Sequence, residues 1–245
     1  MENGGVRGLT DPATMMVVAI ARALRDREVV FHGLASPVPM VAVLLARKLH
    51  APNLVYLNIA AGVDPHPVEL PESTVDPRLS HGAAALFSLA DVFDLAARGR
   101  VDTAFLSGVQ VDRRGRLNMS VIGDYDRPKV RLPGGAGGAF LAPLVRRVLV
   151  WRTRHDPRTL VEEVDFATIR GRVERVFTPL CTFVMDRGAL RVESIHPYSS
   201  PAEVRERTGF AVEVDAGTPV TPPPTAEELA ALEEVDPRRV RDVEF

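Results

Sequence analysis

The sequence predicts an α/β protein built on an open, mostly parallel sheet with helices on both of its faces. Helical and strand-like segments alternate through roughly the first sixty residues, which is typical of parallel strands joined by helical crossovers. The chain has 245 residues, of which 46% are hydrophobic. It is therefore long enough to bury a large core within one domain.

The individual elements are predicted from the spacing of apolar residues. Apolar residues recur at helical steps in three segments, which predicts helices at residues 14–26, 37–50 and 80–98. Shorter apolar runs predict strands, at residues 28–32, 53–59, 102–106 and 147–152. Two hairpins are expected, with turns at residues 113–116 and 186–188.

The expected organisation is a single domain with short segments at either end. We predict a flexible leader over residues 1–13, one domain over 14–236 and a tail over 237–245. Within the domain, the proline-rich segment 218–225 is expected to be stiff and extended. A capping box at Thr225 and Glu228 predicts a helix over residues 226–235. The arginine-rich tail is expected to be solvated or to contact a partner.

Composition and charge exclude several classes of function. The net charge of −2 gives no electrostatic reason to expect nucleic acid or a membrane surface as a partner. No window approaches the ~20 apolar residues of a membrane span, and the first eleven residues lack the apolar core of a signal peptide. The only cysteine, Cys181, rules out an internal disulfide and suits a reducing cytoplasm, where we expect the protein to act.

The histidine, serine and cysteine residues do not show the sequence patterns of common metal-binding or catalytic sites. The six histidines lack metal-ligand spacing, so we predict no metal site. Among them His32 ends a strand and has the best chance of facing a cleft, although a structural role is favoured. No serine has a paired His and Asp signature, and the Gly-x-Ser-x-Gly motif is absent. Cys181 lies in an apolar strand and is expected to be a buried hydrophobe.

The glycine run Gly134–Gly138 is the most informative short motif. Glycine lets backbone N–H groups approach a ligand closely, and a helix start adds positive potential. Such a loop can hold an oxyanion or a phosphate without any side chain. The dinucleotide fingerprint fails because Phe140 stands at its third glycine, and no P-loop exists. The alternative is a flexible turn between a strand and a helix.

The order of three motifs resembles the small, beta subunit of family I coenzyme A transferases. The motifs are VDRRGRLNMSVIG at 111–123, RPKVRLPGGAGGAF at 127–140 and TGF at 208–210, and the resemblance runs from about Met15 to Asp236. It implies an open α/β fold related to sugar-phosphate isomerases. It also implies an obligate alpha subunit, commonly with two copies of each chain, and an acyl-coenzyme A substrate. Coenzyme A then enters as part of the substrate, and no tightly bound cofactor is expected.

One turn departs from the family pattern. The resemblance implies a Ser-Glu-Asn-Gly turn whose glutamate attacks the thioester and then carries coenzyme A. Aligned on Gly62, this sequence has Ile59-Ala60-Ala61-Gly62, so alanines stand at the glutamate and asparagine positions. A methyl group cannot act as a nucleophile. The usual transferase mechanism is therefore not expected from this chain.

Two segments are especially similar to one branch of the family, the two-subunit hydrolase that opens the last ring in steroid degradation. They are SVIGDYDRPKVRLPGGAGGAF and HPYSSPAEVRERTGF. This resemblance implies hydrolytic carbon–carbon cleavage of a cyclic acyl-coenzyme A thioester in cholesterol catabolism, with the essential glutamate on the alpha subunit. Two alternatives stay open. One is a coenzyme A transferase whose nucleophile comes from the partner, and the other is a non-catalytic scaffold or sensor.

The candidate site residues follow from these interpretations. Gly135, Gly137 and Gly138 are expected to donate backbone hydrogen bonds to a thioester or ring oxygen. The residues expected to contact substrate or coenzyme A are Asn58, Ala60, Ala61, Gly62, Tyr125, Asp126, Arg127, Arg131 and Ala136. The alternatives are salt bridging for the charged residues, capping of its own turn for Asn58, and ordinary packing for Tyr125 and Tyr56.

Overall fold

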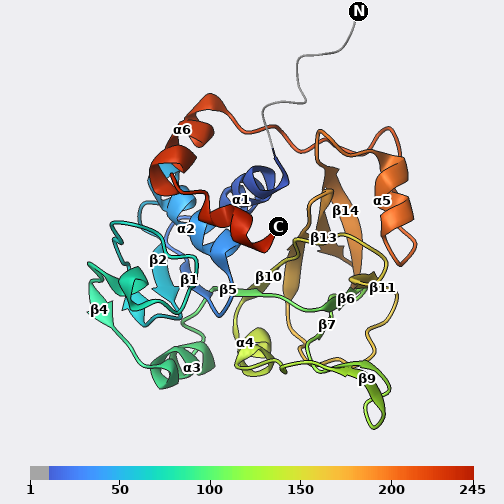
Figure 1. The fold of residues 1–245 in the computed structure, drawn as a ribbon, viewed down its shortest axis with the longest axis horizontal. Coiled ribbons are helices and arrows are strands. Elements are labelled where there is room, and N and C mark those ends of the chain that lie inside the picture. Colours follow the sequence, from blue (N-terminus) through green and yellow to red (C-terminus); the bar gives the residue numbers. More distant parts are fainter. Residues whose placement is uncertain (1–10) are drawn as a thin grey trace, which may run out of the picture.

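The computed structural model describes residues 11–245. Their main element is a nine-stranded mixed sheet (Figure 1). The strand order is β14-β13-β12-β10-β5-β1-β2-β3-β4. The five central strands are parallel: β12 (Val173–Phe177), β10 (Arg147–Trp151), β5 (Thr103–Leu106), β1 (Val29–His32) and β2 (Val55–Asn58). Antiparallel strands form both edges: β13 (Cys181–Asp186) and β14 (Ala189–Ile195), and β3 (Gly62–Val63) and β4 (Ala85–Leu86). The predicted fold class is confirmed.

Helices cover both faces of this sheet. One face carries α1 (Pro12–Ala23), α2 (Pro37–Leu49), α6 (Ala226–Val235) and the 3-10 helix η2 (Val240–Glu244). The other face carries α3 (Leu89–Ala97) and α4 (Gly138–Leu144). Successive strand residues point to opposite faces, so Val30 and Phe105 join the first core while Phe31 and Ala104 join the second.

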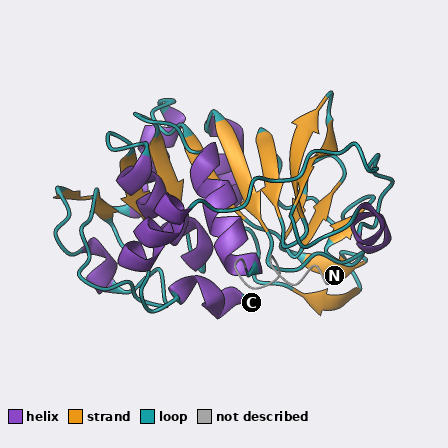
Figure 2. Ribbon diagram, turned by 90° about the horizontal axis from the view of Figure 1, so that it is seen from above, coloured by secondary structure: helices purple, strands orange, loops and turns teal. Residues whose placement is uncertain are grey.

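The remaining elements lie mainly around the second face. A three-stranded sheet contains β11 (Leu160–Val161), β6 (Gln110–Asp112) and β7 (Leu117–Asn118), and a separate ribbon contains β8 (Val121–Gly123) and β9 (Pro128–Arg131). Two short helices complete the fold, η1 (Pro77–Ser80) and α5 (Pro201–Arg207). Figure 2 shows helices gathered at one end of the molecule, with strands and loops making up most of the other end.

Most predicted elements are confirmed, and local signals explain where they begin and turn. Asp11 accepts a hydrogen bond from the Thr14 amide at 2.7 Å, which caps α1. The second hairpin turns at Arg187 and Gly188, both with positive φ, which is the turn that matches strand twist. The predicted capping box of Thr225 and Glu228 is present at the start of α6.

The helix predicted over residues 80–98 is wrong in its first half. Only Leu89–Ala97 is helical, and the preceding residues form η1, a turn and the edge strand β4. Gly82 adopts a left-handed conformation, with φ +67, which interrupts a helix. Ser88 and Asp91 then form a capping box, with the Ser88 amide donating to the Asp91 carboxylate at 2.7 Å. This pair sets the true start of α3.

The two predicted ends also differ from the structure. Helix α1 begins at Pro12, before the predicted leader ends at residue 13, and the leader otherwise lies outside the described residues. The tail is packed in part, because Arg241 is 1% exposed and ion-paired with Asp236 at 2.9 Å, whereas Arg238 and Arg239 are exposed as expected. The buried Asp236 carboxylate also accepts from the Val240 amide at 2.7 Å. Arg241 Nε also donates to Thr14 Oγ1 at 3.2 Å, which links η2 to α1.

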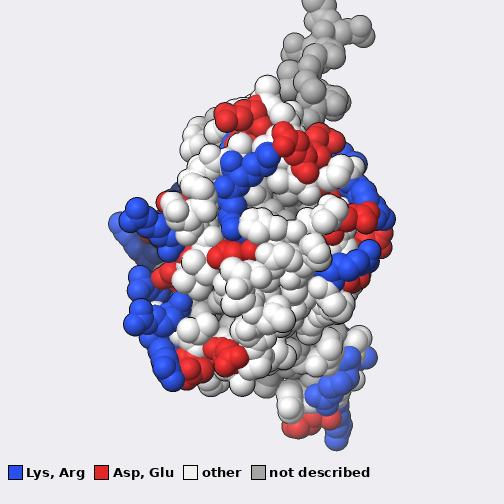
Figure 3. All heavy atoms as spheres, turned by 90° about the vertical axis from the view of Figure 1, so that its left-hand side faces the viewer, with Lys and Arg blue, Asp and Glu red and all other residues white. Residues whose placement is uncertain are grey.

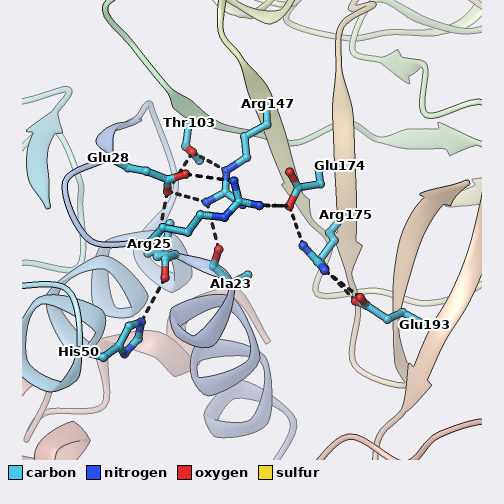
Figure 4. Close-up of polar contacts among 10 residues, drawn as sticks. Ala23, Arg25, Glu28, His50, Thr103, Arg147, Glu174, Arg175 and Glu193 are labelled. Carbon is cyan, nitrogen blue, oxygen red and sulfur yellow. Dashed lines mark hydrogen bonds and ion pairs between the residues drawn. The ribbon is translucent and has the colours of Figure 1, made fainter.

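A polar network ties together the amino-terminal ends of the central strands (Figure 4). Arg147, at the start of β10, donates from Nη2 to Glu28 at 2.5 Å and from Nη1 to Glu174 at 2.9 Å. Its Nε donates to Thr103 Oγ1 at 2.8 Å, and Nη2 also donates to the Ala23 carbonyl at 3.0 Å. The network lies opposite the carboxyl ends of the strands, so its role is to stabilise the sheet.

Candidate functional site

The turn that follows β2 is held by its own backbone and by Asn58. Asn58 is buried, its Oδ1 accepts from the Gly62 amide at 3.2 Å, and its Nδ2 donates to the Leu79 carbonyl at 3.3 Å. The Ala61 amide donates to the Asn58 carbonyl at 3.0 Å. Both polar atoms of the Asn58 side chain are therefore engaged within the chain. The structure agrees with the interpretation in which Asn58 caps its own turn.

Ala60 and Ala61 form a tight, strained tip on this turn. Ala61 has φ 75, in a region that costs a residue with a Cβ atom about 1–2 kcal/mol. The Ala60 carbonyl accepts a hydrogen bond from the Ser80 hydroxyl, a contact that the sequence did not indicate. At Gly62 a Cβ atom would lie 3.1 Å from both Asn58 Nδ2 and Ser80 Oγ, so a larger residue would require these side chains to shift.

No free carboxylate is available on this turn. Asp64 is the only acidic residue between positions 57 and 64. Its Oδ1 accepts from the Tyr56 amide at 2.8 Å and lies 3.5 Å from Arg47 Nη1. Asp64 is therefore committed to holding β2 and α2. The turn offers a small, neutral wall and no nucleophile.

In the glycine loop at the start of α4, some backbone amides are hydrogen-bonded within the chain and others are not. The Gly138 amide donates to the Gly135 carbonyl at 2.8 Å, and Gly138 is buried, so this donor is already used. Within residues 11–245, neither the Gly135 nor the Gly137 amide donates a hydrogen bond to the chain. Two of the three predicted backbone donors are therefore free. Ala136, between them, is exposed with φ 43.

Close packing is a second reason for glycine in this loop. A Cβ atom at Gly137 would lie 2.6 Å from Phe93 Cζ, which is shorter than atoms can approach. At Gly135 it would lie 2.9 Å from Thr168 Cγ2. The loop is therefore wedged between α3 and neighbouring residues. It is not the flexible turn that the sequence left open.

Helix α3 connects the turn after β2 with the glycine loop. Just before it, the Phe87 amide donates to the Ala61 carbonyl at 3.0 Å. Farther along the helix, Phe93 packs against Gly137. The turn follows the carboxyl end of the parallel strand β2, and Gly138 lies beside Leu106 at the carboxyl end of β5. This is the edge where open α/β sheets bind ligands. The structure thus brings Ala60 and Gly137 to the same edge of the sheet, at the carboxyl ends of its central strands.

Four other predicted site residues lie away from the turn after β2. Tyr125, Asp126, Arg127 and Arg131 are exposed on the β8–β9 ribbon, which extends from the body away from β2 and β4 (Figure 1). Tyr125 stacks on Phe166 with ring centroids 4.7 Å apart, and Arg131 lies 5.2 Å from the Tyr125 ring centre. These contacts give the ribbon an ordered aromatic tip.

His32 belongs to a buried polar cluster at the end of β1. Its Nδ1 lies 2.7 Å from Ser36 Oγ, and its Nε2 is hydrogen-bonded to the Tyr56 hydroxyl. All three residues are fully buried. Burial lowers the pKa of His32 to about 4 and raises that of Tyr56 well above its ordinary value. The sequence missed this Ser–His pair, but without solvent access it has a structural role.

Two further observations limit the chemistry that this chain carries, and a third concerns membrane-spanning helices. Burial raises the pKa of the Cys181 thiol to about 12, so the thiolate nucleophile does not form at neutral pH. Over the described part of the chain, no three His, Cys, Asp or Glu side chains are grouped so that they could hold a metal ion. In the same part, none of the helices has the length and apolar character needed to span a membrane.

Comparison with known proteins agrees with this geometry. The sequence model of the family described as Coenzyme A transferase matches residues 13–206, well over half of the chain. The chain belongs to the coenzyme A transferase family. It is 33% identical over 191 residues to the B-type subunit of the 3-oxoadipate CoA-transferase of Pseudomonas knackmussii, covering 70% of this chain and 73% of that protein.

Two further proteins, which are not named as transferases, are also similar. A chain in the crystal structure of a variant of the decarboxylase AibA/AibB superposes with a TM-score of 0.89 at 39% identity, covering 96% of this chain and 98% of that chain. The cholesterol ring-cleaving hydrolase IpdB subunit of Rhodococcus jostii is 31% identical over 172 residues, covering 62% of this chain and 66% of that protein. The resemblance to the hydrolase branch was predicted from sequence. In identity and in coverage of this chain, it is weaker than the similarity to the decarboxylase.

These relatives share an organisation as well as a fold. The names of the transferase and hydrolase relatives describe them as subunits, and the decarboxylase is named for two components, AibA and AibB. An alpha subunit is therefore implied as the partner of this chain.

Proposed function

We propose that this chain is the B-type subunit of a two-subunit enzyme that cleaves a carbon–carbon bond in an acyl-coenzyme A thioester. The observation that carries the proposal is Ala60. Ala60 stands where the transferase pattern has its nucleophilic glutamate. No other residue of this turn offers a nucleophile in its place. An A-type subunit, equivalent to the alpha subunit, supplies the catalytic base. This chain supplies the neutral wall and the free amides of Gly135 and Gly137.

The first reaction to test is decarboxylation, because this chain is 39% identical to a chain of the decarboxylase AibA/AibB over 96% of its length. In this reaction the bond to a substrate carboxylate breaks and carbon dioxide leaves. The electron pair passes into the enolate of the thioester, which is then protonated. A glutamate at position 60 would repel the substrate carboxylate, whereas a methyl group desolvates it and favours its loss. Amides at Gly135 and Gly137 stabilise the enolate oxygen.

The second candidate is hydrolytic ring opening of a steroid-derived thioester. It is supported by the 31% identity to the cholesterol ring-cleaving hydrolase subunit and by the two similar sequence segments. Water adds to the ring ketone with help from a base, and the adjacent carbon–carbon bond then breaks. The product gains one carboxylate, and the same enolate is protonated. The small residues at positions 60 and 61 leave space for a bulky alicyclic group.

The proposal includes an assembly of two A-type and two B-type chains. The exposed Arg127 and Arg131 are suited to pairing with the phosphates of coenzyme A, since guanidinium groups bind phosphate through paired hydrogen bonds. Coenzyme A enters and leaves as part of the substrate. A transferase with its nucleophile on the A-type chain and a non-catalytic scaffold are the outcomes against which the proposal is tested.

The experiment is turnover by the purified pair in ¹⁸O-labelled water with linear carboxyl-bearing and cyclic acyl-coenzyme A thioesters. Release of carbon dioxide supports decarboxylation, whereas label in a new carboxylate supports ring opening. Formation of a new thioester on an added carboxylic acid would instead identify a transferase. No product from any thioester, with the pair intact by light scattering, would favour the scaffold and overturn the proposal.

A further inference from the structure

We infer that the surface formed by β4 and the first turns of α3 is where the A-type subunit docks. This β4–α3 face consists of Ala84, Ala85, Leu86, Leu89 and Ala90, with Phe140 of α4 beside it. The inference rests on the proposed function for the existence of the A-type chain. It adds which surface of this chain that subunit covers.

The face is apolar and open to solvent. Leu86 is 73% exposed, and Leu89 and Phe140 are each 51% exposed. Leu89 and Phe93 are four residues apart on α3 and share one side of the helix. The Phe93 ring meets Phe140 edge-on, with centroids 5.5 Å apart. Figure 3, which views the side of the molecule where β4 and α3 lie, shows a broad area free of charged side chains. Contiguous apolar surface of this kind marks an interaction site.

The backbone of β4 is also unprotected. It is the last strand of the nine-stranded sheet and pairs on one side only, with Gly62 opposite Leu86 and Val63 opposite Ala85. Natural edge strands carry charges, prolines or bulges that prevent pairing with another chain. Residues 83–87 read AAALF and contain no charge or proline, so the short length of β4 is its only protection of this kind. An extended segment of a partner can therefore add to this edge.

The position of the face selects the A-type subunit as its occupant. The Phe87 amide donates to the Ala61 carbonyl at 3.0 Å, and Phe93 packs under Gly137. A chain seated on the face therefore adjoins both the turn after β2 and the glycine loop. A second copy of this chain would bring another Ala60 turn without a base. An A-type chain would bring the base that the site lacks.

The test is the affinity between the two purified chains, measured by biolayer interferometry without substrate. Leu86→Asp places a charge in the middle of the face and is expected to weaken association at least tenfold. Val220→Asp is the matched control, because Val220 is 61% exposed on the proline-rich segment, and it should bind as the native chain does. Both lone variants should keep the native circular dichroism spectrum and melting temperature.

Hydrogen exchange of the native pair provides a second measurement that does not depend on a variant. The amides of residues 84–90 should exchange at least tenfold more slowly in the pair than in the lone chain. Unchanged exchange there, or equal binding by the Leu86 and Val220 variants, would overturn the inference. Loss of self-association in the Leu86 variant with unchanged A-type binding would assign the face to a second copy. An intact pair without turnover would instead count against the proposed function.

Discussion

Replacing Arg147 with methionine is expected to destabilise the protein strongly without touching the candidate site. The Arg147 side chain is 6% exposed, and that of its partner Glu28 is 11% exposed. Methionine keeps the apolar length but leaves the Glu28 carboxylate and the buried Thr103 hydroxyl without their main partner. Breaking a buried ion pair on one side costs about 3–5 kcal/mol, because the remaining charge stays desolvated.

That loss of stability lowers the melting temperature by an amount that calorimetry can measure. A chain of this length unfolds with an entropy of about 0.5 kcal/mol per kelvin near its midpoint. The Arg147→Met variant should therefore melt about 6–10 °C below the native chain. Arg191→Met is the control, because Arg191 forms an exposed ion pair with Asp186 at 3.4 Å and should shift the midpoint by about 1 °C. Equal shifts for the two variants would refute the structural role of the network.

Three further predictions concern the site and its supports. Ala60→Glu should lower turnover of the pair at least tenfold while the chain still folds, as steady-state kinetics and circular dichroism will show; unchanged kinetics would place the turn outside the site. Gly137→Ala should destabilise the chain by about 1–3 kcal/mol in urea titrations because of the clash with Phe93, and Phe93→Leu should restore part of that loss. Burial raises the pKa of Glu244 to about 7, so the free energy of unfolding of the native chain should fall as the pH rises from about 4.5 to 7. In Glu244→Gln this pH-dependent loss of stability should be absent. Parallel pH profiles of the native chain and the variant would contradict the prediction.

The raised pKa of Glu244 explains why the stability of the folded chain should fall, and not rise, with increasing pH. Between its ordinary pKa near 4.5 and the folded value near 7, the unfolded chain loses the proton while the folded chain keeps it. Raising the pH therefore favours unfolding in that window. The carboxyl group is held by the Trp151 indole N–H at 3.1 Å, a contact that the glutamine carbonyl retains. The substitution thus isolates ionisation from packing.

Four of the five central strands were predictable from sequence because each is a short apolar run with clear ends. The fifth, β12, was not predicted, because charged residues interrupt its sequence VERVF. The segment before α3 was not, because its alanine-rich run has apolar residues at helical and strand spacings alike. The Ser88–Asp91 capping box was a local signal that could have placed the helix correctly. The burial of Arg241 in the tail was not foreseen, because Arg241 contacts Thr14 at the other end of the sequence as well as the nearby Asp236.

The candidate site was predictable only where one segment contains it. The turn at Ala60 and the glycine loop are each continuous in sequence, and the resemblance to the family located both. Their connection through Phe93 depends on two segments more than forty residues apart, so spacing along the chain could not reveal it. The ribbon around Tyr125 is adjacent to the glycine loop in sequence but extends away from the turn after β2 (Figure 1).

The most direct measurement is a crystal structure of the A/B pair with an unreactive acyl-coenzyme A analogue. The thioester should lie between the methyl group of Ala60 and the amides of Gly135 and Gly137, with a carboxylate of the A-type chain facing the bond to be cleaved. A thioester bound far from both Ala60 and Gly137 would contradict the role assigned to this chain.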